Sequence, residues 1–205
     1  MAFFTDYATL QTTVARYLAR TDLTADIPDF IRLAEDRLRR DLRTRFMLKV
    51  STTTLSNATV ELPDDFLAMK DVHIQGNPVV TLDFQSVSNF FRNARTSTVG
   101  VPNTYTLLGA EFQVAPAPQS EYTMQMVYYY KPDYLSPTNS SNLWLANTPD
   151  LILYATLGEA EPFLMNDERI NTWAALYDRG VTSLTKSDDD GEYPAHPMSI
   201  TLTTR

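Results

Sequence analysis

The period of the hydrophobic residues changes twice along the chain, and this change limits the fold more than any other feature of the sequence. Apolar residues recur at helical spacing before residue 46, alternate with polar residues over 46–131, and return to helical spacing after residue 147. A period of 3.6 predicts amphipathic helices, and a period of two predicts half-buried strands. Helices that begin and end a chain tend to pack together when the part between them is self-contained. We therefore expect an α+β fold, a helical bundle formed by N- and C-terminal helices with an inserted all-β module.

The same boundaries divide the chain into four segments. We expect residues 1–45 and 133–185 to form the two halves of the helical bundle, and residues 46–132 to form the inserted β module. Residues 186–205, KSDDDGEYPAHPMSITLTTR, have no buried period, so we expect an extended C-terminal arm. A chain of 205 residues with 43% hydrophobic residues is long enough to bury a core.

Two helices are expected in the N-terminal half of the bundle. The first covers residues 6–20, with Thr5 as its N-cap. The second has Pro28 in its first turn, where the missing N–H costs little. Its buried stripe is expected to contain Ile27, Phe30, Ile31, Ala34, Leu38 and Leu42. Its outer side is expected to carry Arg32, Arg39 and Arg43.

The middle segment contains several runs with strand periodicity. We expect strands at 46–55 and 58–62, near 71–75, and at 79–84, and a short helix at 86–95. The run TYTLLGAEFQVAP is expected to form a hairpin that turns at Gly109-Ala110. The last long strand is YTMQMVYYYK, and one of its faces is expected to carry Tyr122, Met124, Met126, Tyr128 and Tyr130.

Helical signals return after a polar, proline-bearing connection at 132–147. Thr148 is expected to cap the next helix, with Pro149 in its first position and Pro162 bending or ending it. A last helix is expected to begin near Asp167, and its apolar stripe consists of Ile170, Trp173, Ala174, Tyr177, Val181 and Leu184.

Charge is distributed unevenly along a chain whose formal net charge is −8. Residues 37–49 contain six basic residues and one acidic residue, whereas residues 150–192 contain ten acidic residues and three basic ones. This asymmetry favours packing against copies of the same chain or against a complementary partner. An acidic chain is a poor non-specific DNA binder, because attraction to phosphate dominates that kind of affinity.

The basic residues concentrate at the end of the second expected helix, as Arg37, Arg39, Arg40, Arg43 and Arg45. Three explanations remain open for them: local pairing with Glu35, Asp36 and Asp41, salt bridges to another subunit or partner, and contact with nucleic-acid phosphate. Helix-turn-helix recognition needs a short turn and base-reading side chains, and neither is evident. Aromatic residues are not interleaved with the arginines, as they are in single-strand binders.

The sequence offers no residue set for catalysis, metal binding or cofactor binding. It has no cysteine, and its two histidines, His73 and His196, lie on an expected strand and between two prolines. The motifs GxxxxGK[ST], GxGxxG, GxSxG and HExxH are absent. The acidic run at 188–191 lacks the alternating ligands and the terminal glutamate of a calcium loop. We expect a protein that is not an enzyme and needs no cofactor.

Neither a secretory signal nor a membrane span is expected. The start MAFFTDYATL lacks a basic region followed by a long apolar run. No window of the sequence approaches the roughly 18 consecutive apolar residues of a membrane helix.

Four long segments of the chain resemble a known family. They are LTADIPDFIRLAEDRLRRDLRTR, VELPDDFLAMKDVHIQGNPVVTLDF, VPNTYTLLGAEFQVAPAPQSEYTMQMVYYYKPDYLS and NLWLANTPDLILYATLGEAEPFLMNDERINTWAALYDRGVTSL. In order and spacing they are similar to the head-to-tail adaptor family of short-tailed bacteriophages, over about residues 6–185. The resemblance rests on whole segments rather than on a single catalytic motif.

The resemblance implies a structural virion protein rather than an enzyme. Members of the family form a ring, usually of twelve copies, below the portal protein at one vertex of the capsid. The ring extends the DNA channel and docks tail nozzle or fibre proteins, and double-stranded DNA passes through its lumen without sequence recognition. The implied location is the neck of the virion, after synthesis in the host cytoplasm.

Two further expectations follow from the resemblance and the charge pattern. Family members use a C-terminal arm to reach the portal or a neighbouring subunit, so we expect such a role for the arm of this chain. Its candidate contact residues are Tyr193, Met198, Ile200 and Leu202. The five arginines are candidate contacts to a subunit, the portal or the DNA channel, and the alternative function is a nucleic-acid-binding regulator that uses the arginine-rich helix.

Overall fold

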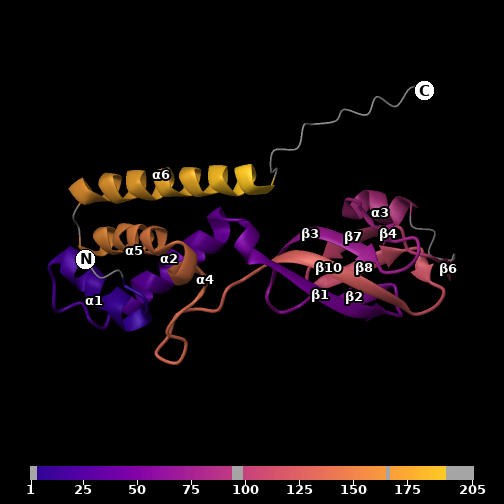
Figure 1. Ribbon diagram of the computed structural model, residues 1–205, viewed down its shortest axis with the longest axis horizontal. Helices are drawn as coiled ribbons and strands as arrows, with labels where there is room; N and C mark the ends of the chain where they lie inside the picture. Colours follow the sequence, from indigo (N-terminus) through magenta and orange to yellow (C-terminus); the bar gives the residue numbers. More distant parts are fainter. Residues whose placement is uncertain (1–3, 94–98, 165–166, 193–205) are drawn as a thin grey trace, which may run out of the picture. The chain divides into compact units, whose positions relative to one another are not determined.

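The chain folds into two compact units, which we call the helical unit and the β unit (Figure 1). The computed structural model describes residues 4–93, 99–164 and 167–192. The helical unit contains the described residues up to Phe46 and from Pro132 onward, and the β unit is Met47–Lys131. The chain therefore leaves the helical unit once and returns to it once. This confirms the predicted α+β fold class with an inserted β module.

The helical unit is built around α5 (Pro149–Leu164), which contacts every other long helix of the unit. These helices are α1 (Tyr7–Leu18), α2 (Ile27–Asp41) and α6 (Asp167–Glu192), and Figure 1 shows α6 lying alongside α5. The apolar residues of α5 point in all directions, which is the pattern of a helix enclosed by others. Buried residues of α2 lie on the predicted stripe, including Ile31, Ala34 and Leu38.

Two predicted helix caps are wrong. The N-cap of α1 is Asp6 instead of Thr5, because Thr9 lies three residues after Asp6: the Thr9 N–H donates to Asp6 Oδ1 at 2.8 Å and the Thr9 hydroxyl accepts from the Asp6 N–H. Thr148 does precede α5, but its hydroxyl donates to the Trp144 carbonyl at 3.1 Å. The Thr148 hydroxyl therefore binds a carbonyl of the preceding helix and does not cap α5.

That preceding helix, α4 (Leu143–Asn147), was expected to be irregular connection. Asn142 caps it by accepting from the Leu145 N–H at 3.2 Å, and Trp144 is fully buried. A polar cap beside one buried aromatic residue is enough to form one turn of helix. The segment is too short for its periodicity to be visible in the sequence.

The C-terminal helix continues seven residues past the predicted boundary, so residues 186–192 are helical rather than part of an extended arm. The inward positions after Leu184 are Asp188 and Gly191, which are not apolar and so gave no periodic signal. Asp188 accepts hydrogen bonds from Arg45, and a Cβ at Gly191 would lie 2.3 Å from the Arg45 guanidinium. The inward face of α6 therefore continues past Leu184 through polar contacts with Arg45. Tyr193, Met198, Ile200 and Leu202 lie outside the described residues.

The β unit consists of two four-stranded sheets that enclose one core. The first has the order β1-β10-β3-β4, with bounds β1 Leu48–Leu55, β10 Tyr122–Tyr130, β3 Phe66–Ile74 and β4 Val80–Thr81. The second has the order β2-β8-β7-β5, with bounds β2 Thr59–Glu61, β8 Glu111–Ala115, β7 Thr104–Leu108 and β5 Asp83–Phe84. Smaller elements are η1 Arg45–Met47, α3 Val87–Asn93, β6 Val99–Gly100 and β9 Ala117–Pro118.

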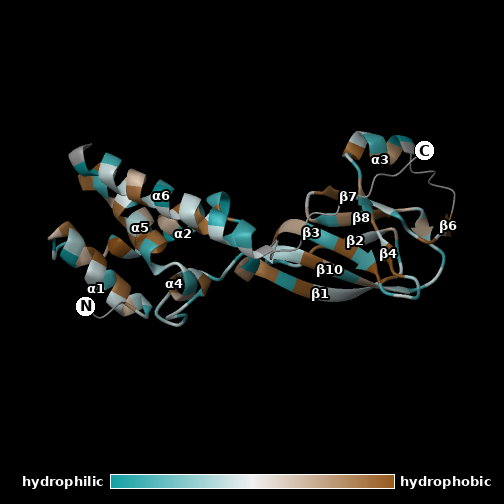
Figure 2. Cartoon of the chain, turned by 45° about the horizontal axis from the view of Figure 1, so that its top comes forward, coloured by the Kyte–Doolittle hydropathy of each residue, from teal (hydrophilic) through white to brown (hydrophobic). Residues whose placement is uncertain are grey.

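Hydrophobic and hydrophilic residues follow one another along these strands, as the colour bands of Figure 2 show. Met124, Met126 and Tyr128 of β10 are buried together with Phe112 and Val114 of β8, and Tyr122 and Tyr130 are partly buried against the same core, so these five residues do share one face of the strand as predicted, and that face is the inward one. The hairpin at Gly109 is also confirmed, with Gly109 at φ 63°. The predicted strand at 79–84 is divided, because β4 and β5 join different sheets on either side of the buried Leu82.

Replacing Asp188 with alanine is expected to loosen the end of α6. The variant loses an acceptor that binds both the backbone N–H and the Nε of Arg45, each at 3.0 Å. A lost hydrogen bond to a charged group is worth about 1.5 kcal/mol, so amides of residues 185–191 should exchange hydrogen about tenfold faster. Asp189→Ala, which changes the exposed neighbour, is the matched control. Equal exchange rates in the two variants would show that Asp188 does not hold the helix end.

Candidate functional site

The arginine-rich end of α2 is the strongest candidate for a functional site. Among the described residues, no group of three or more His, Cys, Asp or Glu side chains is placed to hold a metal ion. In the same part of the chain, no helix is both long enough and apolar enough to cross a membrane. His73 lies 3.2 Å from Asp71 on β3, and His196 lies outside the described residues. The five arginines near the end of α2 are the remaining candidates.

Arg37 joins three helices of the helical unit. Its guanidinium lies 4.1 Å from the ring centroid of Tyr177 on α6, and its Nη1 lies 3.6 Å from a Glu159 oxygen on α5. The Tyr177 hydroxyl donates to Asp41 Oδ2 at 2.7 Å, and Arg37 Nε lies 3.7 Å from the same oxygen. Burial, followed by the hydrogen bond to Asp41, raises the pKa of Tyr177. Arg37 therefore has both aromatic and acidic partners within its own chain.

Arg39 binds the segment by which the chain re-enters the helical unit. Its guanidinium carbon lies 3.5 Å from the ring centroid of Tyr134, and its Nη2 donates to the Pro132 carbonyl. Arg32 lies over the same ring at 3.7 Å, so Tyr134 contacts two guanidinium groups. The Tyr134 hydroxyl donates to Asp36, and this hydrogen bond is the main cause that raises the pKa of Tyr134.

The prediction that Arg39 lies on the outer side of α2 is wrong, since its side chain is only 13% exposed. Tyr134 and Pro132 are more than 90 residues away in the sequence and cover Arg39 only once the chain has folded. Arg32 and Arg43 are exposed, as predicted.

Glu35 is a buried acidic residue that the sequence analysis did not single out as a site. It is 1% exposed, and its oxygens accept from the Leu135 N–H at 3.1 and 3.3 Å and from Asn142 Nδ2 at 2.6 Å. Burial raises the pKa of Glu35 to about 7, against the lowering effect of these hydrogen bonds and of the nearby Arg39. The sequence does carry a sign of this burial, because Glu35 lies four residues after Ile31 and so falls within the apolar stripe of α2.

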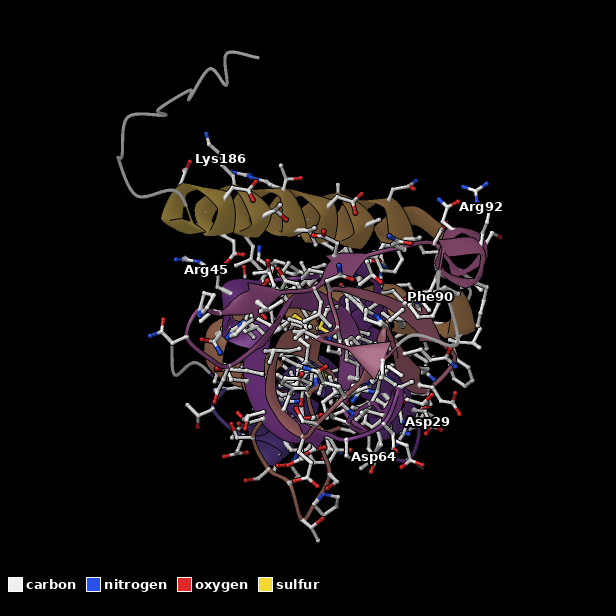
Figure 3. The ribbon with its side chains drawn as sticks, turned by 90° about the vertical axis from the view of Figure 1, so that its right-hand side faces the viewer. Asp29, Arg45, Asp64, Phe90, Arg92 and Lys186 are labelled. Carbon is white, nitrogen blue, oxygen red and sulfur yellow. The ribbon has the colours of Figure 1, made fainter. Side chains whose placement is uncertain are left out.

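Arg45 binds the end of α6. Its backbone N–H lies 3.0 and 3.1 Å from the two oxygens of Asp188, and its Nε lies 3.0 Å from one of them. Figure 3 shows Arg45 on one side of α6 and Lys186 projecting from the other side. Arg45 is therefore the third of the five arginines, after Arg37 and Arg39, that has a partner within the helical unit.

Arg40 and Arg43 differ from the other three arginines, because neither forms an ion pair with any residue that the structure describes. Both are exposed, and Arg43 Nη1 donates to backbone carbonyls of its own helix end, including Arg39 O at 2.7 Å. Arg32 and Arg40 are exposed residues of α2, and Arg43 is an exposed residue that follows the C-cap Leu42. We call Arg32, Arg40 and Arg43 the exposed basic face; Arg40 and Arg43 are the two of the five predicted arginines that remain available to another molecule.

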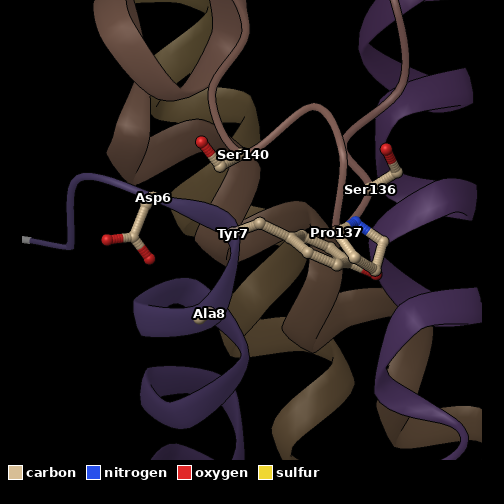
Figure 4. A pocket seen from close by; sticks show the side chains of 6 residues that line it. All are labelled: Asp6, Tyr7, Ala8, Ser136, Pro137 and Ser140. Carbon is tan, nitrogen blue, oxygen red and sulfur yellow. The ribbon is translucent and has the colours of Figure 1, made fainter.

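A hollow of about 270 Å³ lies where α1 begins, and Figure 4 shows it between Asp6, Tyr7, Ala8, Ser136, Pro137 and Ser140. The polar groups around it already have partners: Asp6 Oδ1 accepts from Thr9, and the Tyr7 N–H donates to the Ser140 carbonyl at 2.7 Å. The hollow therefore marks a contact between α1 and the loop before α4.

The helical unit and the inserted β unit define an α+β protein. The family model described as SU10 adaptor protein matches residues 5–199. The chain therefore belongs to the SU10 adaptor protein family, a family of phage head-to-tail adaptors. Membership implies a component of the virion that contacts portal and tail proteins, and a structural rather than an enzymatic role. No curated protein matches the chain.

Replacing Glu35 with glutamine is expected to change how stability depends on pH. The pKa of Glu35 is about 7 in the folded chain and ordinarily 4.5, so the folded state binds the proton more tightly than the unfolded state. The stability that Glu35 provides is therefore complete below pH 4.5 and is lost as the pH rises through 7. We expect the variant to match the parent near pH 4 and to exceed its free energy of unfolding by on the order of 2 kcal/mol at pH 8.

Denaturant unfolding at several pH values measures this difference. Glu121→Gln, a change at an exposed glutamate, is the control and should follow the parent at every pH. A difference between Glu35→Gln and the parent that stays constant with pH would contradict the argument from burial.

Proposed function

We propose that this chain forms a ring, of twelve copies, directly below the portal protein at one vertex of the capsid. The ring extends the DNA channel and docks the nozzle or fibre proteins of the tail. Double-stranded DNA passes through its lumen during packaging and ejection without sequence recognition. The observation that carries this proposal is the family match over residues 5–199, nearly the whole chain of 205 residues.

The distribution of charge supports ring formation. A closed ring is made by heterologous contacts, in which each copy presents two different surfaces. The exposed basic face is one such surface, and the exposed Asp189 and Asp190 near the end of α6 are charges of the opposite sign. We propose that Arg40 and Arg43 contact a neighbouring copy or the portal, and that Arg37, Arg39 and Arg45 support this face from within the helical unit.

The overall charge agrees with a DNA conduit. A lumen that bound phosphate tightly would slow the passage of DNA, and each copy has a formal net charge of −8. The alternative, a nucleic-acid-binding regulator, has less support. It would use the arginine-rich helix, yet three of the five arginines already have partners in the helical unit.

The direct test is to add the chain to phage heads that carry the portal but lack this protein. The proposal expects a collar of twelve copies below the portal in cryo-electron microscopy images. Heads that bind no copies, or isolated chains that bind duplex DNA with strong salt dependence, would overturn it.

The variant Arg40→Glu/Arg43→Glu is expected to bind such heads about tenfold less tightly. The variant loses two exposed ion pairs worth about 0.5–1 kcal/mol each, and their sum corresponds to a change of about tenfold in the dissociation constant. Titration of labelled chain onto heads measures the affinity, and circular dichroism checks the fold. Arg169→Glu/Arg179→Glu makes the same change of charge at two exposed residues of α6 and serves as the control. Equal losses in both variants would show that only total charge matters.

A further inference from the structure

The free edge of β1 is the longest unpaired strand edge that the described residues contain. β1 ends its sheet and pairs on one side only, with β10. No backbone hydrogen bond among the described residues reaches residues 50–54 from the other side. The other ends of the two large sheets, β2, β4 and β5, are strands of only three, two and two residues.

The sequence of β1 has little that protects this edge. Proteins usually block exposed edges with proline, charged residues or β-bulges. The strand LKVSTTTL has no proline, and Lys49 is its only charged residue. Its register with β10 runs from Leu48 to Leu55 without a shift, whereas the ladder between β10 and β3 shifts twice. Val50 is 55% exposed. An edge of this kind is a template for a strand from another chain segment.

The C-terminal sequence of the chain has the pattern of such a strand. In MSITLTT, residues 198–204, the apolar Met198, Ile200 and Leu202 alternate with Ser199, Thr201 and Thr203. These residues lie outside the described part of the chain. Burial alternates along the second half of β1, since Thr52 and Thr54 are exposed while Thr53 and Leu55 are less so. A strand with one apolar and one polar face suits the end of a half-buried sheet.

We propose that residues 198–204 of one copy add as a strand to the free edge of β1 in the neighbouring copy. The proposal rests on the ring proposed above and names the contact that links its members. The donor segment and the acceptor edge are different surfaces of one chain, so the contact is heterologous and repeats from copy to copy until the ring closes. Backbone hydrogen bonds hold the added strand, and the alternating side chains set its register.

Disulfide cross-linking tests the contact directly, because the chain has no cysteine of its own. Thr52→Cys is combined in one chain with Ser199→Cys, Thr201→Cys or Thr203→Cys, to cover different registers. After assembly on portal-bearing heads and oxidation, we expect a ladder of covalent oligomers in at least one register, which reduction removes. A matched control places the acceptor cysteine at Thr59, an exposed residue of the short edge strand β2, and should give no ladder.

Two outcomes of the cross-linking would overturn the proposal. Monomers with an internal disulfide would mean that residues 198–204 pair with β1 of the same copy. The absence of a cross-link in every register, with a collar visible on the heads, would exclude the strand and leave the proposed function intact. Absence of the collar itself would refute the proposed function, so the two failures are distinguishable.

Proline substitutions test whether the segment binds as a strand. Successive backbone N–H groups of a strand point to opposite edges, and proline has none. With the donor cysteine at Ser199 or Thr203, we expect one of the variants Ile200→Pro and Thr201→Pro to lose the cross-link about tenfold or more, while the other retains it. Circular dichroism verifies that both variants fold like the parent. Equal effects of the two prolines would show that the segment does not bind through strand hydrogen bonds.

Discussion

The helical unit depends on the contacts that two covered side chains of α2, Glu35 and Arg39, make with the returning chain. Glu35 and Arg39 are almost fully covered, and both bind the segment that follows Pro132. Leaving a buried polar group without its hydrogen-bond partner costs about 1–3 kcal/mol, whereas an exposed ion pair contributes about 0–1 kcal/mol. Detachment of this segment would leave both groups without partners in poorly solvated surroundings. Because the segment is where the chain re-enters the helical unit, these contacts fix the point of return from the inserted β unit.

Much of the fold could be predicted from the sequence, because periodicity and turn chemistry are local. The inward face of β10 follows from strict alternation, and the hairpin at Gly109 follows from a glycine that accepts positive φ. The helix caps and the short helix α4 failed on local hydrogen bonds, whereas the length of α6 and the burial of Arg39 depended on contacts between distant segments. The last turns of α6 are held by Asp188 and Gly191 against Arg45, which is 143 residues from Asp188 in the sequence. Asp188 and Gly191 recur at helical spacing, but because neither is apolar, hydrophobic periodicity does not detect this part of the helix.

The candidate site was predictable only as a concentration of positive charge. The sequence shows five arginines near the end of α2, but the partners that distinguish them come from elsewhere in the chain. Tyr134 covers Arg39, Tyr177 and Glu159 surround Arg37, and no local pattern connects these residues. Local pairing was one of the three explanations considered, and Asp36 and Asp41 do lie beside Arg39 and Arg37. The aromatic partners were not anticipated, because cation–π contacts leave no mark in a charge pattern.

The division among the arginines has a consequence for assembly. Arginines with partners inside the helical unit have fewer donors left to link copies, so exposed charges such as Arg40 and Arg43 would supply most of the electrostatic contacts of the proposed ring. Each exposed pair is worth about 0–1 kcal/mol, which is too little to join free copies. A portal that binds several copies raises their local concentration, so contacts that are weak singly become sufficient together. Because single charge pairs are weak, newly made copies would stay separate until a portal brings them together.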